Sequence, residues 1–232
     1  MRTLFGLIVL FAILSPNSFA QKTSDKYDGD PFSSDAANSS QMLAEGFKRY
    51  EVESGIITYK LSGNMQSGTK TIYFDRWGLR EATYEESVTK IFGLKQKSET
   101  ISFLDGENMY NYDPKKNTYM RTKNTLVKPV ADEMSNGEKS MTKGGKAFLE
   151  GMGGKLIGNE TFMGKDCEIW ELASLNSTNY IWKGVSLKAT ATLLGMTTEW
   201  EATDIQINVE VPEDKLSLPK KAKSVFADMG RK

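Results

Sequence analysis

The fold of this chain is decided by the stretch TTEWEATDIQINVEV, residues 197–211. In its second half, polar residues alternate with Ile205, Ile207, Val209 and Val211. This alternation predicts a strand with one buried face and one wet face. Trp200 and Ala202 have even numbers, whereas the four later apolar residues have odd numbers, so a regular strand would place the two sets on opposite faces. A bulge or sharp twist near Thr203 would bring both sets to the same face. We therefore expect a strongly curved sheet.

Strand patterns also precede this stretch. Residues 55–61 and 70–75 are rich in β-branched and aromatic residues, and the turn residues between them predict a hairpin. Residues 101–104 and 108–112 flank Asp105-Gly106, a dipeptide suited to a tight primed turn because both residues accept positive φ. Consecutive antiparallel strands are therefore expected here.

Further strands are predicted on either side of the middle of the chain. The turn over residues 113–117 leads into a strand at residues 118–121. Three later strands are predicted at residues 167–172, 179–182 and 187–194. The chain lacks the strand-helix-strand rhythm of a nucleotide-binding fold.

Apolar residues recur at helical spacing in two segments of the chain. Residues 33–47 predict one short helix, with Ser33, Ser34 or Asp35 as its cap. Residues 126–152 predict two short helices or one broken helix, whose apolar stripes include Val130 and Met134, then Met141 and Phe148. The expected fold class is α+β, mainly β. Its core is a curved antiparallel sheet, an incomplete β-barrel, covered by a few short helices.

The N-terminal segment resembles a secretory signal. Arg2 precedes an apolar run over residues 4–14, and Ser18-Phe19-Ala20 supplies small residues for cleavage. We expect a signal peptide at residues 1–20 and a flexible leader at residues 21–32. A single β domain then spans residues 33–219, and a basic tail spans residues 220–232.

The residue composition excludes most metal sites and nucleophilic active sites. It contains no histidine and one cysteine, Cys167, whereas common metal sites and nucleophilic triads need an imidazole or several thiolates. Thirty basic residues balance thirty acidic ones, so no net charge attracts nucleic acid. We expect Cys167 to be a buried core residue, and we expect no catalytic residue, metal or cofactor. Two Ser-x-x-Lys matches, at Ser87 and Ser140, lack the partner motifs of penicillin-recognising enzymes.

Several short motifs carry a family resemblance. They are Gly158-Asn159-Glu160-Thr161, residues 164–170, residues 180–188, and Pro212 through Leu218-Pro219. Together with the hairpin from Gly55, they resemble the pattern of bacterial envelope proteins related to the lipoprotein carriers LolA and LolB. The likeness covers residues 41–219. It implies an incomplete barrel closed by helices around an apolar cavity that receives acyl chains.

The resemblance implies a periplasmic protein that holds an acyl chain or another lipid-like ligand, with a role in lipid or lipoprotein transport. The expected partners are a lipid, an acyl chain or a lipoprotein, with transient contact to a membrane or an envelope protein. We expect a monomer. The candidate cavity residues are Ile57, Tyr59, Val130, Met134, Met141, Phe148, Ile205, Ile207 and Val209. The alternative is a structural or partner-binding envelope module whose core is filled by these side chains.

Overall fold

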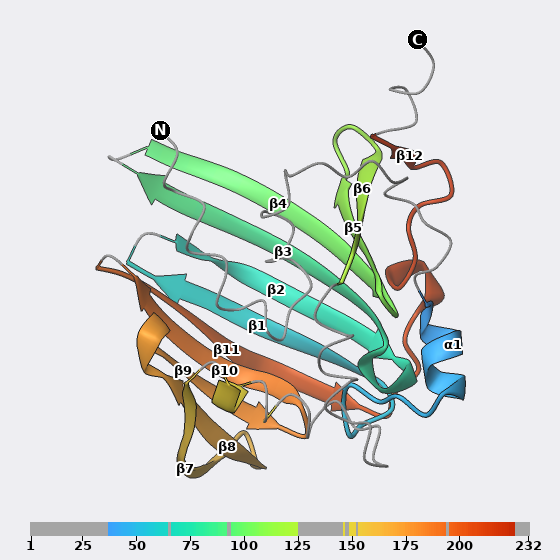
Figure 1. Ribbon diagram of the computed structural model, residues 1–232. Helices are drawn as coiled ribbons and strands as arrows, with labels where there is room; N and C mark the ends of the chain where they lie inside the picture. The colour runs from blue at the N-terminus through green and yellow to red at the C-terminus, as the bar shows by residue number, and fades with distance from the viewer. Residues whose placement is uncertain are drawn as a thin grey trace.

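A curved, open sheet dominates the structure. The computed structural model describes residues 37–64, 66–91, 94–124, 146, 149–151, 153–193 and 195–225. In these residues the chain forms one twelve-stranded sheet, ordered β12-β6-β5-β4-β3-β2-β1-β11-β10-β9-β8-β7 (Figure 1). Because this order runs from one edge to the other, the described sheet is an incomplete barrel. The expected mainly β fold class is confirmed.

The described residues of the first half of the chain form one helix, one 3-10 turn and one arm of the sheet. These elements are α1 (Ser39–Ala44), β1 (Gly55–Gly63), β2 (Gln66–Asp75), η3 (Arg76–Gly78), β3 (Arg80–Ile91), β4 (Leu94–Asp105), β5 (Asn108–Asp113) and β6 (Thr118–Lys123). Successive strands pair antiparallel, as short connections require.

The second half contributes the other arm. It comprises β7 (Gly154–Phe162), β8 (Lys165–Leu172), η4 (Ala173–Leu175), β9 (Ser177–Trp182), β10 (Val185–Leu193), β11 (Met196–Ile207), η5 (Glu213–Lys215) and β12 (Lys223–Ser224). Strand β12 pairs parallel with β6, so the sheet includes residues beyond 219, where the sequence suggested that the domain ends.

The two arms meet where β1 pairs with β11. Their register shifts between Thr58, opposite Asp204, and Tyr59, opposite Ala202, which leaves Thr203 as the extra residue of a bulge. The predicted irregularity near Thr203 is therefore confirmed. A bulge bends its strand and increases the local twist, which helps to curve the sheet.

The end of β11 differs from the prediction. The strand ends at Ile207, and Asn208 adopts a left-handed conformation with φ 55°. Val209 therefore lies beyond the strand, and Val211 packs on the opposite face of the sheet from Ile207. The expectation that all four apolar residues share one face is wrong, because the left-handed residue turns the chain away from the sheet.

Two other local predictions are also corrected. The cap of α1 is Asn38, whose side chain accepts from the Gln41 backbone N–H, because the helix begins later than its apolar spacing suggested. In the β4–β5 hairpin, Asp105 is still paired with Asn108, so the two turn residues are Gly106 and Glu107. Gly106 supplies the positive φ, 63°.

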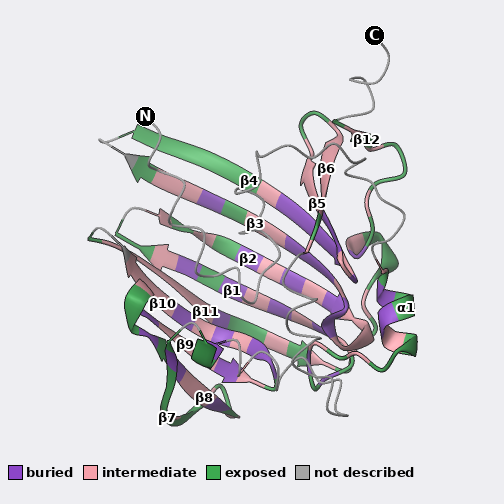
Figure 2. Ribbon diagram, in the orientation of Figure 1, coloured by how far each residue is buried: buried purple, intermediate pink, exposed green. Residues whose placement is uncertain are grey.

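The two faces of the sheet are covered differently. We call the side that carries Ile57, Tyr59 and Leu61 the inner face. The hydroxyl of Tyr59 donates to the carbonyl of Ser186 on β10, two strands away, so the sheet curls toward this side. Figure 2 shows buried residues concentrated toward the end of the sheet near α1, while the far end of β4 is exposed.

On the outer face, the segment that follows β11 packs over an aromatic surface. Leu216 is buried against Ala82, Ile101 and Phe103. Partly buried side chains complete this cluster: Tyr73, Tyr84, Tyr110, Tyr112, Val211 and Leu218. Tyr84 stands edge-on to both Tyr73 and Phe103, a favourable arrangement for aromatic rings.

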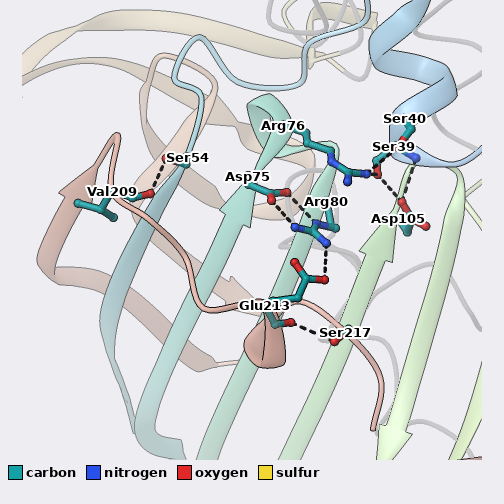
Figure 3. A network of polar contacts seen from close by, with 10 residues as sticks. All are labelled: Ser39, Ser40, Ser54, Asp75, Arg76, Arg80, Asp105, Val209, Glu213 and Ser217. Carbon is teal, nitrogen blue, oxygen red and sulfur yellow. Dashed lines mark hydrogen bonds and ion pairs between the residues drawn. The ribbon is translucent and has the colours of Figure 1, made fainter. Parts of the chain in front are cut away.

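Polar contacts fasten the same segment to the strand ends (Figure 3). Arg80 pairs with Asp75 and donates from Nη1 to Glu213 on η5 at 2.7 Å. The hydrogen bonds to Asp75, outweighing the cost of burial, raise the pKa of Arg80. The Ser54 hydroxyl donates to the Val209 carbonyl at 2.7 Å. These contacts hold the chain against the sheet after it leaves β11.

Helix α1 lies at one end of the sheet and packs against η3. Met42 is buried against Leu79, and Arg76 donates to the Ser39 hydroxyl at 2.7 Å. No helix in the described part of the chain is long and apolar enough to cross a bilayer.

Candidate functional site

A packed apolar cluster occupies the part of the inner face nearest α1. It consists of Tyr50, Val52, Ile57, Tyr59, Ile72, Phe74, Cys167, Val185, Leu187 and Ala202. The segment before β1 supplies Tyr50, whose ring stands edge-on to Phe74 with centroids 4.9 Å apart. Cys167 is fully buried, as predicted, and burial raises the pKa of its thiol. This part of the face is filled by the chain itself.

The predicted cavity residues fall into three groups. Ile57 and Tyr59 are buried in this cluster, and Ile205 and Ile207 are partly buried against it. Val209 lies beyond the end of β11, with its carbonyl bound to Ser54. The other four, Val130, Met134, Met141 and Phe148, lie outside the described residues. Their role as cavity residues stays a prediction.

Beyond the cluster, the inner face continues as an apolar row. Leu61 on β1, Trp200 on β11 and Ala189 on β10 lie at successive paired positions, so their side chains share this face. Leu61 and Ala189 are each 1% exposed and lie outside the four apolar clusters that the described residues form. We call these three residues the Leu61 row.

A buried lysine lies beside the Leu61 row. Lys70 is 4% exposed, and its Nζ lies 3.5 Å from the centroid of the Trp200 ring and 4.6 Å from that of Tyr59. Burial lowers the pKa of Lys70 to about 8, although the negative charges of Glu85 and Glu81 oppose the change. Among the described residues, the ammonium makes no hydrogen bond and no ion pair.

Glu85 is the acidic residue opposite Lys70. The two occupy paired positions on β3 and β2, while the lysine side chain extends the other way, toward β11. Burial raises the pKa of Glu85, and the Lys70 charge only partly offsets this. The two charges therefore influence each other without a contact.

Four buried hydroxyl groups of the described residues also lack hydrogen-bond partners, and two of these lie side by side on the inner face. Thr83 on β3 and Ser102 on β4 are paired positions, each 1% exposed, and neither hydroxyl has a hydrogen-bond partner. An unsatisfied buried hydroxyl costs about 1–3 kcal/mol. Such groups in a folded protein call for an explanation, and a polar ligand is one.

A satisfied ion pair closes the end of the face near α1. The carboxylate of Glu81 is fully buried and accepts from Arg49 at 2.9 Å and from the Tyr50 hydroxyl at 2.6 Å. Burial, together with the nearby carboxylate, raises the pKa of Tyr50 well above its usual value. This group ties the segment before β1 to β3.

Sequence reasoning missed the polar residues of this face. A signal existed for Lys70, because it shares the parity of Ile72 and Phe74 in KTIYF and must therefore point to their side. No comparable signal existed for Thr83 and Glu85, since β3 carries polar residues on both parities and was not predicted as a strand.

Comparisons with known proteins find only distant structural similarities. No family model and no curated protein matches the chain. An uncharacterized conserved protein of Thermus thermophilus is 11% identical with a TM-score of 0.47, over 81% of this chain and 98% of that one. MucB of the Pseudomonas aeruginosa MucA/MucB complex is 13% identical with a TM-score of 0.40, over 78% of this chain.

A third structure is a putative outer membrane lipoprotein-sorting protein domain from Vibrio parahaemolyticus. It is 10% identical with a TM-score of 0.31, over 73% of this chain and 92% of that one. This chain spans only 60% of MucB. At these values the likeness identifies no family, ligand or partner for this chain.

Proposed function

We propose that this chain is a non-catalytic binding protein of the cell envelope that holds an acyl chain or a similar lipid-like molecule on its inner face. The observation that carries this proposal is the Leu61 row. It is a buried apolar row that continues beyond the packed cluster and lies beside a buried ammonium, Lys70. A row of apolar side chains with one charge beside it matches the chemistry of an amphiphile.

The hydrophobic effect is large enough for such binding. Moving a methylene group from water into an apolar setting contributes about 0.8 kcal/mol, so a chain of about 16 carbons contributes on the order of 10 kcal/mol before ordering costs. No imidazole, metal or nucleophile is needed for this, in keeping with a chain that has no histidine.

The proposed location rests on the signal-like residues 1–20, and the proposed partners rest on the family resemblance. We propose that the mature protein acts in the bacterial periplasm and exchanges its ligand with a lipoprotein or a membrane. Mass analysis of the exported protein tests this, because a mature chain that begins near Gln21 is expected. An uncleaved N-terminus in protein recovered from the envelope would contradict periplasmic release.

A second candidate is a partner-binding envelope module with a filled core. The observation that favours it is the apolar cluster, in which Tyr50 and Val52 are buried together with Ile57 and Phe74. In that case the inner face near α1 is only structural.

Ligand binding separates the two candidates. Delipidated protein is titrated with 11-(dansylamino)undecanoic acid, and a rise in dansyl fluorescence is expected for the wild type. Leu61→Asn should weaken binding, because it places an amide in the Leu61 row. Leu94→Asn is the matched control, since Leu94 is 77% exposed. Circular dichroism verifies that both variants fold.

The outcomes are distinct. If the wild type shows no fluorescence rise, and native mass spectrometry of protein purified without detergent shows no bound lipid, the lipid-binding proposal fails. The partner-binding module then becomes the better account. If the two leucine variants bind equally, the ligand does not lie on the Leu61 row.

A further inference from the structure

The ammonium of Lys70 has no hydrogen-bond or ion-pair partner among the described residues, so it is available to bind a ligand. Its side chain is buried, and its contacts are the faces of the Tyr59 and Trp200 rings. A ring face attracts a cation but leaves its N–H donors without acceptors. A buried charge normally has a charged and hydrogen-bonded partner, so this site is incomplete without an acceptor.

The acidic residue nearest in register does not supply that acceptor. Glu85 is opposite Lys70, yet the lysine side chain extends away from it over Trp200. Glu81 is already bound by Arg49 and Tyr50. The carboxylates of the described inner face therefore leave the lysine N–H groups available to a ligand.

The position of the ammonium also fixes how a ligand would lie. Trp200 is both the ring beneath Nζ and the middle residue of the Leu61 row. An anionic head at Nζ would thus have the apolar row directly next to it. A single charge against one ammonium fits a carboxylate at the end of one hydrocarbon chain.

We propose that Lys70 binds the carboxylate of a long-chain carboxylic acid, with the hydrocarbon chain lying on the Leu61 row. This inference rests on the proposed function and names its ligand class. Lys70 donates hydrogen bonds to the carboxylate, and the rings of Tyr59 and Trp200 hold the ammonium in place.

The test compares an acid with its neutral ester. Delipidated wild-type protein is titrated at pH 7 with 11-(dansylamino)undecanoic acid and with its methyl ester. The acid should bind about tenfold more tightly, as expected for one charge-assisted hydrogen bond. Lys70→Met should abolish this preference and leave the affinity for the ester unchanged. Lys60→Met is the matched control, because Lys60 is an exposed lysine of the neighbouring strand β1.

Two further measurements keep the test independent of how the variant folds. Glu85→Gln should shift the loss of acid binding to a lower pH, because the charge of Glu85 raises the pKa of Lys70. In the wild type, acid binding should weaken between pH 7 and pH 9.5 as Lys70 loses its proton, while ester binding should not change. Among the described residues, the other ionisable groups near this lysine are Glu81 and Glu85 on β3 and Tyr59 on β1.

The failures of the two proposals are distinguishable. Equal binding of acid and ester by the wild type, or a preference that survives Lys70→Met, overturns the role of Lys70 but leaves acyl binding standing. Binding of neither probe overturns the proposed function and this inference together.

Discussion

Replacing Lys70 with methionine should stabilise the protein. Burial lowers the pKa of Lys70 from 10.5 to about 8. One pKa unit corresponds to about 1.4 kcal/mol, so the charged lysine destabilises the folded state by about 3 kcal/mol below pH 8. Methionine fills a similar volume without charge. Because the pKa of about 8 already includes the attraction of Glu85 and Glu81, the expected gain at pH 7 is about 3 kcal/mol.

The pH dependence has a definite sign. Between pH 8 and pH 10.5 the unfolded chain binds more protons at Lys70 than the folded chain does, so this residue makes stability rise with pH. The destabilisation is fully present below the folded pKa and disappears above the unfolded one. The advantage of Lys70→Met should therefore shrink by about 2 kcal/mol between pH 7 and pH 9.5.

Urea denaturation followed by circular dichroism measures both effects. Wild type, Lys70→Met and the exposed control Lys60→Met are compared at pH 7 and pH 9.5. Taking differences from the wild type cancels the titration of the tyrosines and other lysines. If Lys70→Met is less stable than the wild type at pH 7, or its advantage does not change with pH, the account of Lys70 as a costly buried charge is refuted. Taken together, the two tests should show that Lys70→Met has a higher free energy of unfolding than the wild type and no longer prefers the acid to the ester.

Two further predictions concern the same face of the sheet. Glu81→Ala should lower stability by about 3–5 kcal/mol, because it leaves the Arg49 charge without its buried partner, and should lower Tm by roughly 6–20 °C in thermal denaturation. Lys116→Ala, which removes only an exposed ion pair, should cost less than about 1 kcal/mol, and equal losses for the two variants would contradict the importance of burial. Thr83→Val should leave stability unchanged or raise it by about 1 kcal/mol, since it removes a hydroxyl that has no partner. A loss above about 1 kcal/mol in urea denaturation would show that this hydroxyl is satisfied in the folded protein.

Prediction from the sequence succeeded where one face of a strand is apolar and the other polar. Strands β1 and β2 show this alternation, and the parity change at Thr203 even located the bulge. Prediction failed for β3, whose inner face carries Glu81, Thr83 and Glu85, because without apolar alternation the strand has no periodic signal.

The strand-rich class, the curvature at Thr203 and the burial of Cys167 can be predicted from the chain alone, because each depends on local alternation along one strand. The candidate site, in contrast, depends on contacts between distant strands. Lys70 and Trp200 are far apart in the chain, and they meet because β1 pairs with β2 on one side and with β11 on the other. Which polar residues become buried depends on that long-range pairing, and no local pattern encodes it.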